Sequence, residues 1–493
     1  MIIYNNCISP EKIIFIISIL IFLSTVFSKV MYKIGIPTLI LFLGIGMIAG
    51  CDGVGKIYFD DPHIAQFVGT IALNFILFHG GLETKYSQIK PVLKSASLLA
   101  TVGVFLTAIL TGIFIFYISD FTILESILIG SIVSSTDAAS VFSILRSKDL
   151  NLKGDLAPLL ELESGSNDPM ACILTILFLD LITSPNSNII SYVFMLINQL
   201  VIGCLLGYLL GKLSVKILNK INLDIQGLYP ILTIALAFLI FSLSEYIGGN
   251  GFLSIYIAAI IIGNSNIISK NTIIRFYDGC SWLMQIILFV TLGLLVFPKR
   301  IFNILSIGTL IAVGMILLIR PIVVFLLLYK SKYSTKEKLF ISFVGLRGGA
   351  PIVFATYPLI AGLNIASDIF NIVFYICVFS ILIQGTFLPI LAKKLHLTED
   401  HKENYFLHYK YLEDNNIKNK LFEITIKEES NICGMKILDL NIPQNVLIIL
   451  IERTNQYIIP KGDTTIKSGD KLILISKTLD DFLDVKNEFY KLN

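Results

Sequence analysis

Two apolar stretches of the sequence contain carboxylates that could bind and release a cation. Asp168 lies in "ELESGSNDPMACILTILFLDL" with Glu161 and Glu163, and Asp137 lies in "ILIGSIVSSTDAASVFSIL". An ionised carboxylate at the centre of a bilayer costs at least about 2.5–3.5 kcal/mol, so such residues persist where they face a water-filled cavity, pair with a base or bind an ion. The two stretches therefore indicate an ion site inside a membrane.

The spacing around Asp168 brings other polar side chains near it. Ser164 and Asp168 are four residues apart, as are Glu163 and Asn167, so on a helix the members of each pair lie close together. Oxygen ligands from Asp, Thr, Ser and backbone carbonyls suit an alkali cation. A single carboxylate that holds either the cation or a proton, but not both, makes such a site an exchanger. Because Asn167 carries no charge, we expect one proton to move per monovalent cation, which is electroneutral exchange.

Two further patterns predict interrupted helices beside these carboxylates. "SSTDAAS" (134–140) has small, hydroxyl-bearing residues around Thr136 and Asp137, and "GLRGGAPIVFA" (345–355) has glycines and a proline around Arg347. Unwound segments offer backbone carbonyls to a cation where they line a cavity, and in transporters they frame the substrate site. We therefore expect the two segments to meet at the ion site.

Glu163 needs a basic partner if it is buried in an apolar helix, because an opposite charge close by favours the ionised carboxylate. The apolar part of the chain offers two arginines for this role. We expect Arg347 to be the partner, with Arg320 as the alternative. Arg320 directly precedes Pro321 and would in either case belong to a buried ion-pair network.

The elements that must position these residues are membrane helices. The chain has 493 residues, of which 55% are apolar, and a mean hydropathy of +0.80. Apolar runs of about 18 or more residues recur, each long enough to cross a bilayer, whereas the short alternating segments of a β-barrel are absent. The seven cysteines have no paired spacing and predict neither a zinc site nor a disulfide framework. The fold class is therefore an all-α polytopic membrane protein.

We predict thirteen membrane segments. The fifth and the twelfth contain the two interruptions, and this odd offset of seven reverses the orientation of the second relative to the first. An inverted repeat with crossed, broken helices is therefore expected. The predicted segments are residues 12–32, 35–51, 64–82, 93–117, 122–145, 157–183, 192–218, 228–247, 251–264, 279–297, 303–329, 336–357 and 368–392.

Basic residues gather on one side of the predicted membrane. That side has Lys29, Lys33, Lys85, Lys90, Lys94, Arg146, Lys148, Lys153, Lys212, Lys216, Lys220, Lys270, Arg275, Lys330, Lys332, Lys336, Lys338, Lys393 and Lys394. The other side has Lys12, Lys56, Lys299 and Arg300. The excess of Lys and Arg marks the cytoplasmic side. We therefore expect the N-terminus outside a plasma membrane that the chain crosses many times, and everything after Lys394 in the cytoplasm.

The composition changes after the last predicted membrane segment. We therefore assign residues 1–395 to a transmembrane domain. Residues 396–420 are polar and charged and are typical of a linker. Residues 421–493 then contain the strand-like runs "LFEITI", "VLIILIERT", "QYIIP" and "KLILIS", with Asn455 and Gln456 at a predicted hairpin turn. Apolar residues at helical spacing follow in "TLDDFLDVKNEFYKL". This region is expected to be a small cytoplasmic α+β domain.

The motifs "TDAAS", "ESGSNDP" and "GLRGGAP" resemble those of monovalent cation:proton antiporters of the NhaP and eukaryotic sodium/proton exchanger type. The resemblance implies a thirteen-span inverted-repeat fold with a core and a dimerisation domain, and hence a homodimer. It implies that the cation and proton bind at Thr136, Asp137, Ser164 and Asp168, and that Glu163, Asn167 and Arg347 organise the site. Arg320, as a member of the buried ion-pair network, is expected to help organise it. The Asn-Asp pair is typical of the electroneutral branch. His79 departs from the pattern, because an acidic residue is expected there.

The stretch "LDLNIPQNVLIILIERTNQYIIPKGDTTIKSGDKLILIS" resembles the TrkA-C (RCK_C) domain of potassium channels and transporters. Its combination with an NhaP-type membrane part is similar to the bacterial potassium/proton antiporters of the CvrA type. The implied function is exchange of K⁺ for H⁺ by alternating access, with Na⁺ as the alternative cation and a small cytosolic ligand as a regulator. A regulated channel is less favoured, because no carbonyl-ring filter such as TVGYG is present. No enzyme activity, cofactor or nucleic acid is expected.

Overall fold

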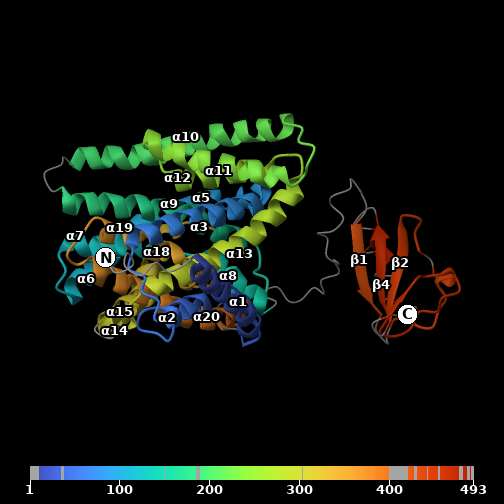
Figure 1. The fold of residues 1–493 in the computed structure, drawn as a ribbon. Helices are drawn as coiled ribbons and strands as arrows, with labels where there is room; N and C mark the ends of the chain where they lie inside the picture. The colour runs from blue at the N-terminus through green and yellow to red at the C-terminus, as the bar shows by residue number, and fades with distance from the viewer. Residues whose placement is uncertain are drawn as a thin grey trace. The chain divides into compact units, whose positions relative to one another are not determined.

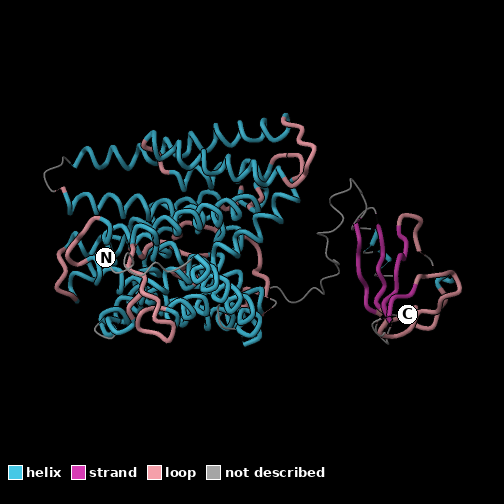
Figure 2. Tube along the Cα trace, viewed as in Figure 1, coloured by secondary structure: helices cyan, strands magenta, loops and turns pink. Residues whose placement is uncertain are grey.

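A computed structural model gives the fold of the chain as ribbon (Figure 1) and tube (Figure 2). It describes residues 10–34, 38–148, 150–184, 189–301, 304–398, 420–426, 430–440, 442–453 and 456–476, together with Asp481, Phe482, Asp484, Val485 and Phe489. The chain divides into two compact units, Met1–Thr398 and Glu399–Asn493. The described residues of the first unit are almost entirely helical, and those of the second form a β-sheet.

Eight helices among the described residues are long and apolar enough to cross a membrane. Six are continuous: α3 (Pro62–Glu83), α9 (Leu156–Thr183), α10 (Ile189–Lys220), α11 (Leu228–Ile247), α13 (Lys270–Leu295) and α20 (Ala366–Lys394). Two contain a π-helical turn: α5 (Leu93–Leu98) with η1 (Leu99–Gly103) and α6 (Val104–Ile118), and α15 (Leu305–Gly314) with η3 (Met315–Ile319) and α16 (Arg320–Leu327).

The other described helices complete the first unit. They are α1 (Pro10–Ile34), α2 (Thr38–Ala49), α4 (Tyr86–Ile89), α7 (Ile123–Ile132), α8 (Ala138–Ser147), α12 (Gly251–Asn264), α14 (Pro298–Ile301), α17 (Thr335–Phe343), α18 (Gly349–Phe354) and α19 (Thr356–Ile360). Their starts follow local sequence signals. Thr122 and Glu125 form a capping box at α7, and Ser334 and Glu337 form one at α17, so each pair satisfies backbone N–H groups at a helix end.

Each of the thirteen predicted segments contains a described helix, but one boundary was wrong. Helix α13 begins at Lys270, nine residues before the predicted start at residue 279, so Lys270 and Arg275 lie on the helix and not in a loop. Ile273 and Tyr277, one helical turn apart, are both buried and pack this first part of the helix against the core. Hydropathy identifies the apolar part of a helix and misses polar turns that continue beyond it.

The fifth and twelfth segments are interrupted, as predicted. Helix α7 ends at Ile132 and α8 begins at Ala138, while α17 ends at Phe343 and α18 begins at Gly349. The two π-helical turns show the same offset of seven segments, because η1 lies in the fourth and η3 in the eleventh. Matching interruptions at this offset agree with the inverted repeat that the sequence indicated.

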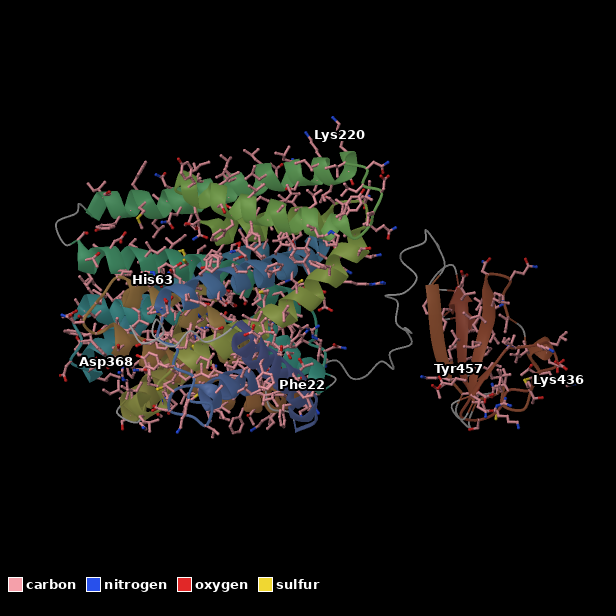
Figure 3. All side chains as sticks on the ribbon, in the orientation of Figure 1. Phe22, His63, Lys220, Asp368, Lys436 and Tyr457 are labelled. Atoms are coloured by element: carbon pink, nitrogen blue, oxygen red, sulfur yellow. The ribbon has the colours of Figure 1, made fainter. Side chains whose placement is uncertain are left out.

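The outside of the helical unit is rich in apolar side chains. Phe22 of α1, which is labelled in Figure 3, is exposed, and only 11% of the apolar window of α10 is buried. Helix α10 lies at one edge of the unit beside α11 and α12 (Figure 1). Lys220 at the end of α10 and Asp368 in the first turn of α20 lie at opposite ends of the helical unit (Figure 3). Apolar flanks between charged ends are typical of a membrane protein.

The second unit is built on a four-stranded antiparallel sheet with the order β1-β4-β2-β3. Its strands are β1 (Lys420–Thr425), β2 (Val446–Arg453), β3 (Gln456–Ile458) and β4 (Lys471–Ser476). One face of the sheet packs on helical residues, with the rings of Phe422 and Phe482 stacked 4.1 Å apart. The predicted strands and the β2–β3 hairpin are confirmed. Asn455 of the predicted turn lies outside the described residues.

Candidate ion-binding site

Helix α9 presents four of the predicted site residues on neighbouring positions, namely Glu163, Ser164, Asn167 and Asp168. Pro169 follows inside the same helix. Proline has no N–H, so the carbonyl four residues before it lacks its usual helical partner. The backbone beside Asp168 is therefore more polar than that of an uninterrupted membrane helix.

Helix α9 binds the interruption of the fifth segment through two side chains. The Ser164 hydroxyl donates to the carbonyl of Thr136 at 2.8 Å and accepts from the backbone N–H of Ala138 at 2.9 Å. Asn167 Nδ2 donates to the hydroxyl oxygen of Thr136. Ser164 thus contacts the backbone on both sides of Asp137, and the interruption is fixed against α9 at this point.

Asp137 is the N-cap of α8. Its carboxylate accepts from the Ser140 N–H at 3.1 Å and from the Ser140 hydroxyl, and its backbone is extended, with φ −117° and ψ 98°. A carboxylate at a helix N-terminus satisfies free N–H groups and is favoured by the helix dipole. The Asp137 N–H donates to the Leu346 carbonyl at 2.8 Å. The interruptions of the fifth and twelfth segments therefore meet at Asp137.

Asp168 is joined to the same interruption by Ser135, whose hydroxyl donates to its carboxylate. Arg347 contacts Ser135 from the other side: its Nη1 donates to the Ser135 carbonyl at 3.0 Å and to the Ser134 carbonyl at 3.4 Å. The guanidinium charge of Arg347 is thus directed at backbone carbonyls of the fifth segment. Ser135 lies between this charge and Asp168.

Of the two predicted partners of Glu163, the favoured one, Arg347, was wrong, and the alternative, Arg320, forms the ion pair. Both side chains of this pair are buried, with 2% of Glu163 and 4% of Arg320 exposed. Arg320 begins α16 directly after the π-helical turn η3, and Pro321 follows it. Neither arginine is close to Glu163 in the chain, so only the packing of α16 and α17 against α9 could decide between them.

Two glycines allow close contacts at the site. A Cβ atom at Gly348 would lie 2.1 Å from Oδ2 of Asp137, and one at Gly165 would lie 2.3 Å from the ring of Tyr256. Contacts below 3.0 Å require something to shift. Gly348 therefore permits the Asp137 carboxylate to pack directly on the backbone of the twelfth segment.

Exposure separates the carboxylates into two kinds. Asp137 and Asp168 are half-buried, as is Ser164, whereas Glu163 is buried with its ion-pair partner. The other buried polar residues of the site are Asn167, Arg320 and Arg347. A half-buried carboxylate within a membrane segment must face water or an ion and not lipid. The geometry therefore brings Thr136, Asp137, Ser164 and Asp168 together. Among the described residues, Asp137 and Asp168 are the two site acids that form no ion pair with an arginine.

Comparison with known proteins agrees with this arrangement. Residues 16–394 match the family described as sodium/hydrogen exchanger, transmembrane, which is more than half of the chain. The chain belongs to the sodium/hydrogen exchanger family. Residues 421–480 of this exchanger also match the TrkA-C domain.

Several relatives of the exchanger cover most of its length. The K(+)/H(+) antiporter NhaP of Alkalimonas amylolytica is 33% identical over 469 residues, which are 95% of this chain and 81% of the relative. The K(+)/H(+) antiporter NhaP2 of Shewanella sp. (strain ANA-3) is 36% identical over 467 residues, with 92% and 79% covered. The solved structure of the sodium proton antiporter MjNhaP1 from Methanocaldococcus jannaschii at pH 8 has a TM-score of 0.67 and 28% identity, and the match covers 78% of this chain and 98% of that one.

Sequence reasoning missed three residues that hold the exchanger's site together. Ser135 was recognised only as part of a run of small residues, although it is the hydrogen-bond donor to Asp168. Ser380 and Gln384 of α20 contact the interruption of the twelfth segment and were not considered. Two polar residues four apart in an otherwise apolar helix were the available signal for this pair.

His79 of the exchanger, where an acidic residue was expected from the resemblance, lies near the end of α3. Its Nε2 is 3.8 Å from Oε1 of Glu83 and 3.9 Å from Oδ1 of Asp278. Both distances exceed the length of a hydrogen bond. His79 is thus in an acidic environment formed by α3 and α13.

Proposed function

We propose that this protein exchanges a monovalent cation for protons across the membrane, with K⁺ as the cation. The observation that carries the proposal is the half-buried carboxylate of Asp168, which accepts a hydroxyl hydrogen bond from Ser135 at the junction of two interrupted helices. K⁺ is favoured over Na⁺ because relatives that cover 92–95% of the chain, TrkA-C region included, are K(+)/H(+) antiporters. The match to MjNhaP1, a sodium proton antiporter, covers less of this chain, namely 78%.

The exchange would depend on competition at Asp168. A cation bound by the ionised carboxylate, with oxygens of Thr136, Asp137 and Ser164 as further ligands, excludes the proton, and protonation removes the charge that binds the cation. The cation-bound protein and the protonated protein would each change between the inward-facing and outward-facing states. Cation movement in one direction is then coupled to proton movement in the other. Asn167, Glu163, Arg320 and Arg347 would organise the site.

One proton per cation is the proposed stoichiometry. Glu163 is paired with Arg320 and Asn167 carries no charge, while Asp137 caps α8. Among the described carboxylates of the site, Asp168 therefore neither forms an ion pair nor caps a helix. A single carboxylate that alternates between H⁺ and a monovalent cation carries the same charge in both directions.

Orientation and assembly are part of the proposal. We place the N-terminus outside and residues 421–493 in the cytoplasm, after a transmembrane domain of residues 1–395 and a linker of residues 396–420. The reason is that most lysines and arginines of the sequence fall on one side of the predicted membrane segments. The exposed apolar face of α10 would contact lipid or a second copy in a homodimer. The TrkA-C region would bind a small cytosolic ligand and shift the balance between the two states, which requires different affinity for each.

The test is exchange by purified protein in liposomes. A K⁺ gradient should move protons with no requirement for Na⁺, and a Na⁺ gradient of equal size should do so more slowly. A membrane potential imposed with a permeant lipophilic ion should leave the final K⁺ gradient at a given ΔpH unchanged. Exchange with Na⁺ alone would assign the protein to Na⁺/H⁺ antiport. A final gradient that shifts with the potential would contradict the one-to-one stoichiometry.

A further inference from the structure

Ser380 and Gln384 on α20 hold both ends of the interruption in the twelfth segment. They are one helical turn apart, share a face of the helix, and are each 2% exposed. The Ser380 hydroxyl oxygen accepts from the Arg347 backbone N–H at 3.1 Å, and the hydroxyl donates to Oε1 of Gln384. Nε2 of Gln384 donates to the carbonyl of Phe343 at 2.7 Å.

These hydrogen bonds meet a need that the interruption creates. Phe343 is the last residue of α17, so its carbonyl has no partner in that helix, and Arg347 lies just before Gly348, the N-cap of α18. An unpaired backbone group that is buried costs about as much as a lost hydrogen bond. Helix α20 thus supplies side-chain partners for two backbone groups that its neighbour leaves open.

The peptide group between Leu346 and Arg347 connects this pair to the ion site. Its carbonyl accepts from the Asp137 N–H at 2.8 Å, and its N–H donates to Ser380. The atoms of a peptide group lie in one plane, so a rotation that breaks one of these bonds also misdirects the other. The orientation that Ser380 gives this plane is therefore passed to the backbone of Asp137.

We propose that Ser380 and Gln384 are positioning residues for the cation site. They fix the Leu346–Arg347 peptide group, and with it the placement of Asp137 and of the Arg347 guanidinium on Ser135. This inference rests on the proposed function, because it assigns the pair to the site that would bind K⁺. The pair acts from a helix that contributes none of the proposed ligands.

A small cavity of about 10 Å³ lies beside the pair, lined among others by Arg320, Gly345 and Arg347. This is about the volume that one water molecule requires. Ser380 and Gln384 also line this cavity. Ser380→Thr, which keeps the hydroxyl, is therefore the conservative variant, and Ser380→Ala is the variant that removes it.

The test compares these variants with Ser342→Ala in liposomes. Ser342 is buried on the neighbouring α17, and its hydroxyl donates to the carbonyl of Lys338 in its own helix. Loss of one hydrogen bond predicts about a 3- to 10-fold rise in the apparent KM for K⁺ in Ser380→Ala. Ser380→Thr should restore the KM, and Ser342→Ala should leave it unchanged.

Amide hydrogen exchange gives a readout that does not depend on transport. In Ser380→Ala the amides of Asp137 and Arg347 should exchange faster than in the wild-type protein, while Ser342→Ala should leave both unchanged. If Ser380→Ala does not fold, Gln384→Met removes the donor to Phe343 at similar side-chain length, and the same amides should exchange faster in it.

The inference is overturned if Ser380→Ala and Ser342→Ala have the same KM and the same exchange at Asp137. It is also overturned if Gln384→Met, used in place of an unfolded Ser380→Ala, leaves both amides protected. A wild-type protein that exchanges no cation would contradict the proposed function instead. If the wild-type protein is inactive, hydrogen exchange at the Asp137 amide still tests whether Ser380 positions the interruption of the fifth segment.

Discussion

Glu163 of α9 and Arg320 of α16 form a buried ion pair, although they are 157 residues apart in the chain. The pair joins the helix that carries Asp168 to the segment that follows the π-helical turn η3. It neutralises one acid of the "ESGSNDP" motif within the protein. Asp137 and Asp168 are thereby left as the carboxylates of the described site that form no ion pair with an arginine.

Breaking this pair should destabilise the protein. Removal of one partner leaves a buried charge unpaired, which costs about 3–5 kcal/mol. Glu163→Gln or Arg320→Gln alone should therefore lower the midpoint of thermal unfolding, and the double variant should lose less than the sum of the two. Glu163→Gln combined with Arg347→Gln serves as the control and should be closer to additive. Additive losses for Glu163 and Arg320 would show that the pair does not exist in the folded protein.

Gly348 should not tolerate a side chain. The Cβ of Gly348→Ala would lie 2.1 Å from the Asp137 carboxylate, so Asp137 or the interruption must move. We expect cation exchange to fall by at least about tenfold, since a misplacement of about 1 Å can cost far more. The control is Gly279→Ala on α13, where an added Cβ has no atom within 4 Å. Normal exchange by Gly348→Ala would contradict the close approach of Asp137 and Gly348.

The sequence was sufficient to predict the membrane class, the two interruptions and the approach of the two interrupted segments to each other, but not the contact of Ser135 with Asp168. Apolar length identifies spans, and Gly, Pro and hydroxyl residues identify the positions where a helix is interrupted, because both properties are local. The sequence left Arg320 and Arg347 as possible partners of Glu163 and favoured the wrong one, because the two arginines are equivalent as charges. Which of them reaches the acid depends on the π-helical turn and on the packing of α16, neither of which is local to Glu163.

The positions of Ser380 and Gln384 could not be predicted for a related reason. Their partners are backbone groups of Phe343 and Arg347, which become open only because the twelfth segment is interrupted. The start of α13 was missed because its first turns are polar and are kept helical by Ile273 and Tyr277. In both cases the structure depends on tertiary contacts that the local composition does not indicate.

Asp470 should make the stability of the second unit depend on pH. Burial raises the pKa of its carboxyl, but hydrogen bonds from Arg453 and the Lys467 N–H outweigh burial, so the pKa lies below its ordinary value. The stabilisation is complete above the unfolded pKa of about 3.9 and is lost as the pH falls through the folded value.

Urea unfolding of a fragment starting at residue 399, which has its own core, measures this effect. Asp470→Asn should cost about 2 kcal/mol at neutral pH and flatten the loss of stability on acidification. Asp463→Asn, at an exposed carboxylate, should keep the wild-type profile. An unchanged pH profile in Asp470→Asn would show that the pair with Arg453 contributes nothing to the fold.

The boundary at which the second unit can be removed is set by contacts after α20. The Lys153 N–H donates to the Leu397 carbonyl at 2.8 Å, and Leu152 and Thr398 form an antiparallel bridge. Lys153 lies just before α9, so these contacts hold the end of α20 beside the helix of the site. A cut before Leu397 would remove part of them.

A chain ending after Thr398 should fold and exchange cations, with altered dependence on pH or cytosolic ligands. A chain ending after Lys394 should be less stable by about 2–6 kcal/mol, because it loses four backbone hydrogen bonds that involve residues 395–397. Thermal unfolding and liposome exchange of the two shortened chains test this difference. Equal stability would show that the contacts with Leu152 and Lys153 are not needed, and an inactive but folded chain ending after Thr398 would show that exchange requires the second unit.

The central claim is that one carboxylate, Asp168, alternates between a proton and a cation. It is tested most directly by K⁺-driven proton movement in liposomes that contain Asp168→Asn. Asn keeps an oxygen that can accept from Ser135, and removing the charge from a half-buried acid should leave the thermal unfolding midpoint near that of the wild type. We predict that proton movement falls to that of liposomes without protein. Proton movement at the wild-type rate in Asp168→Asn would contradict the single-carboxylate mechanism.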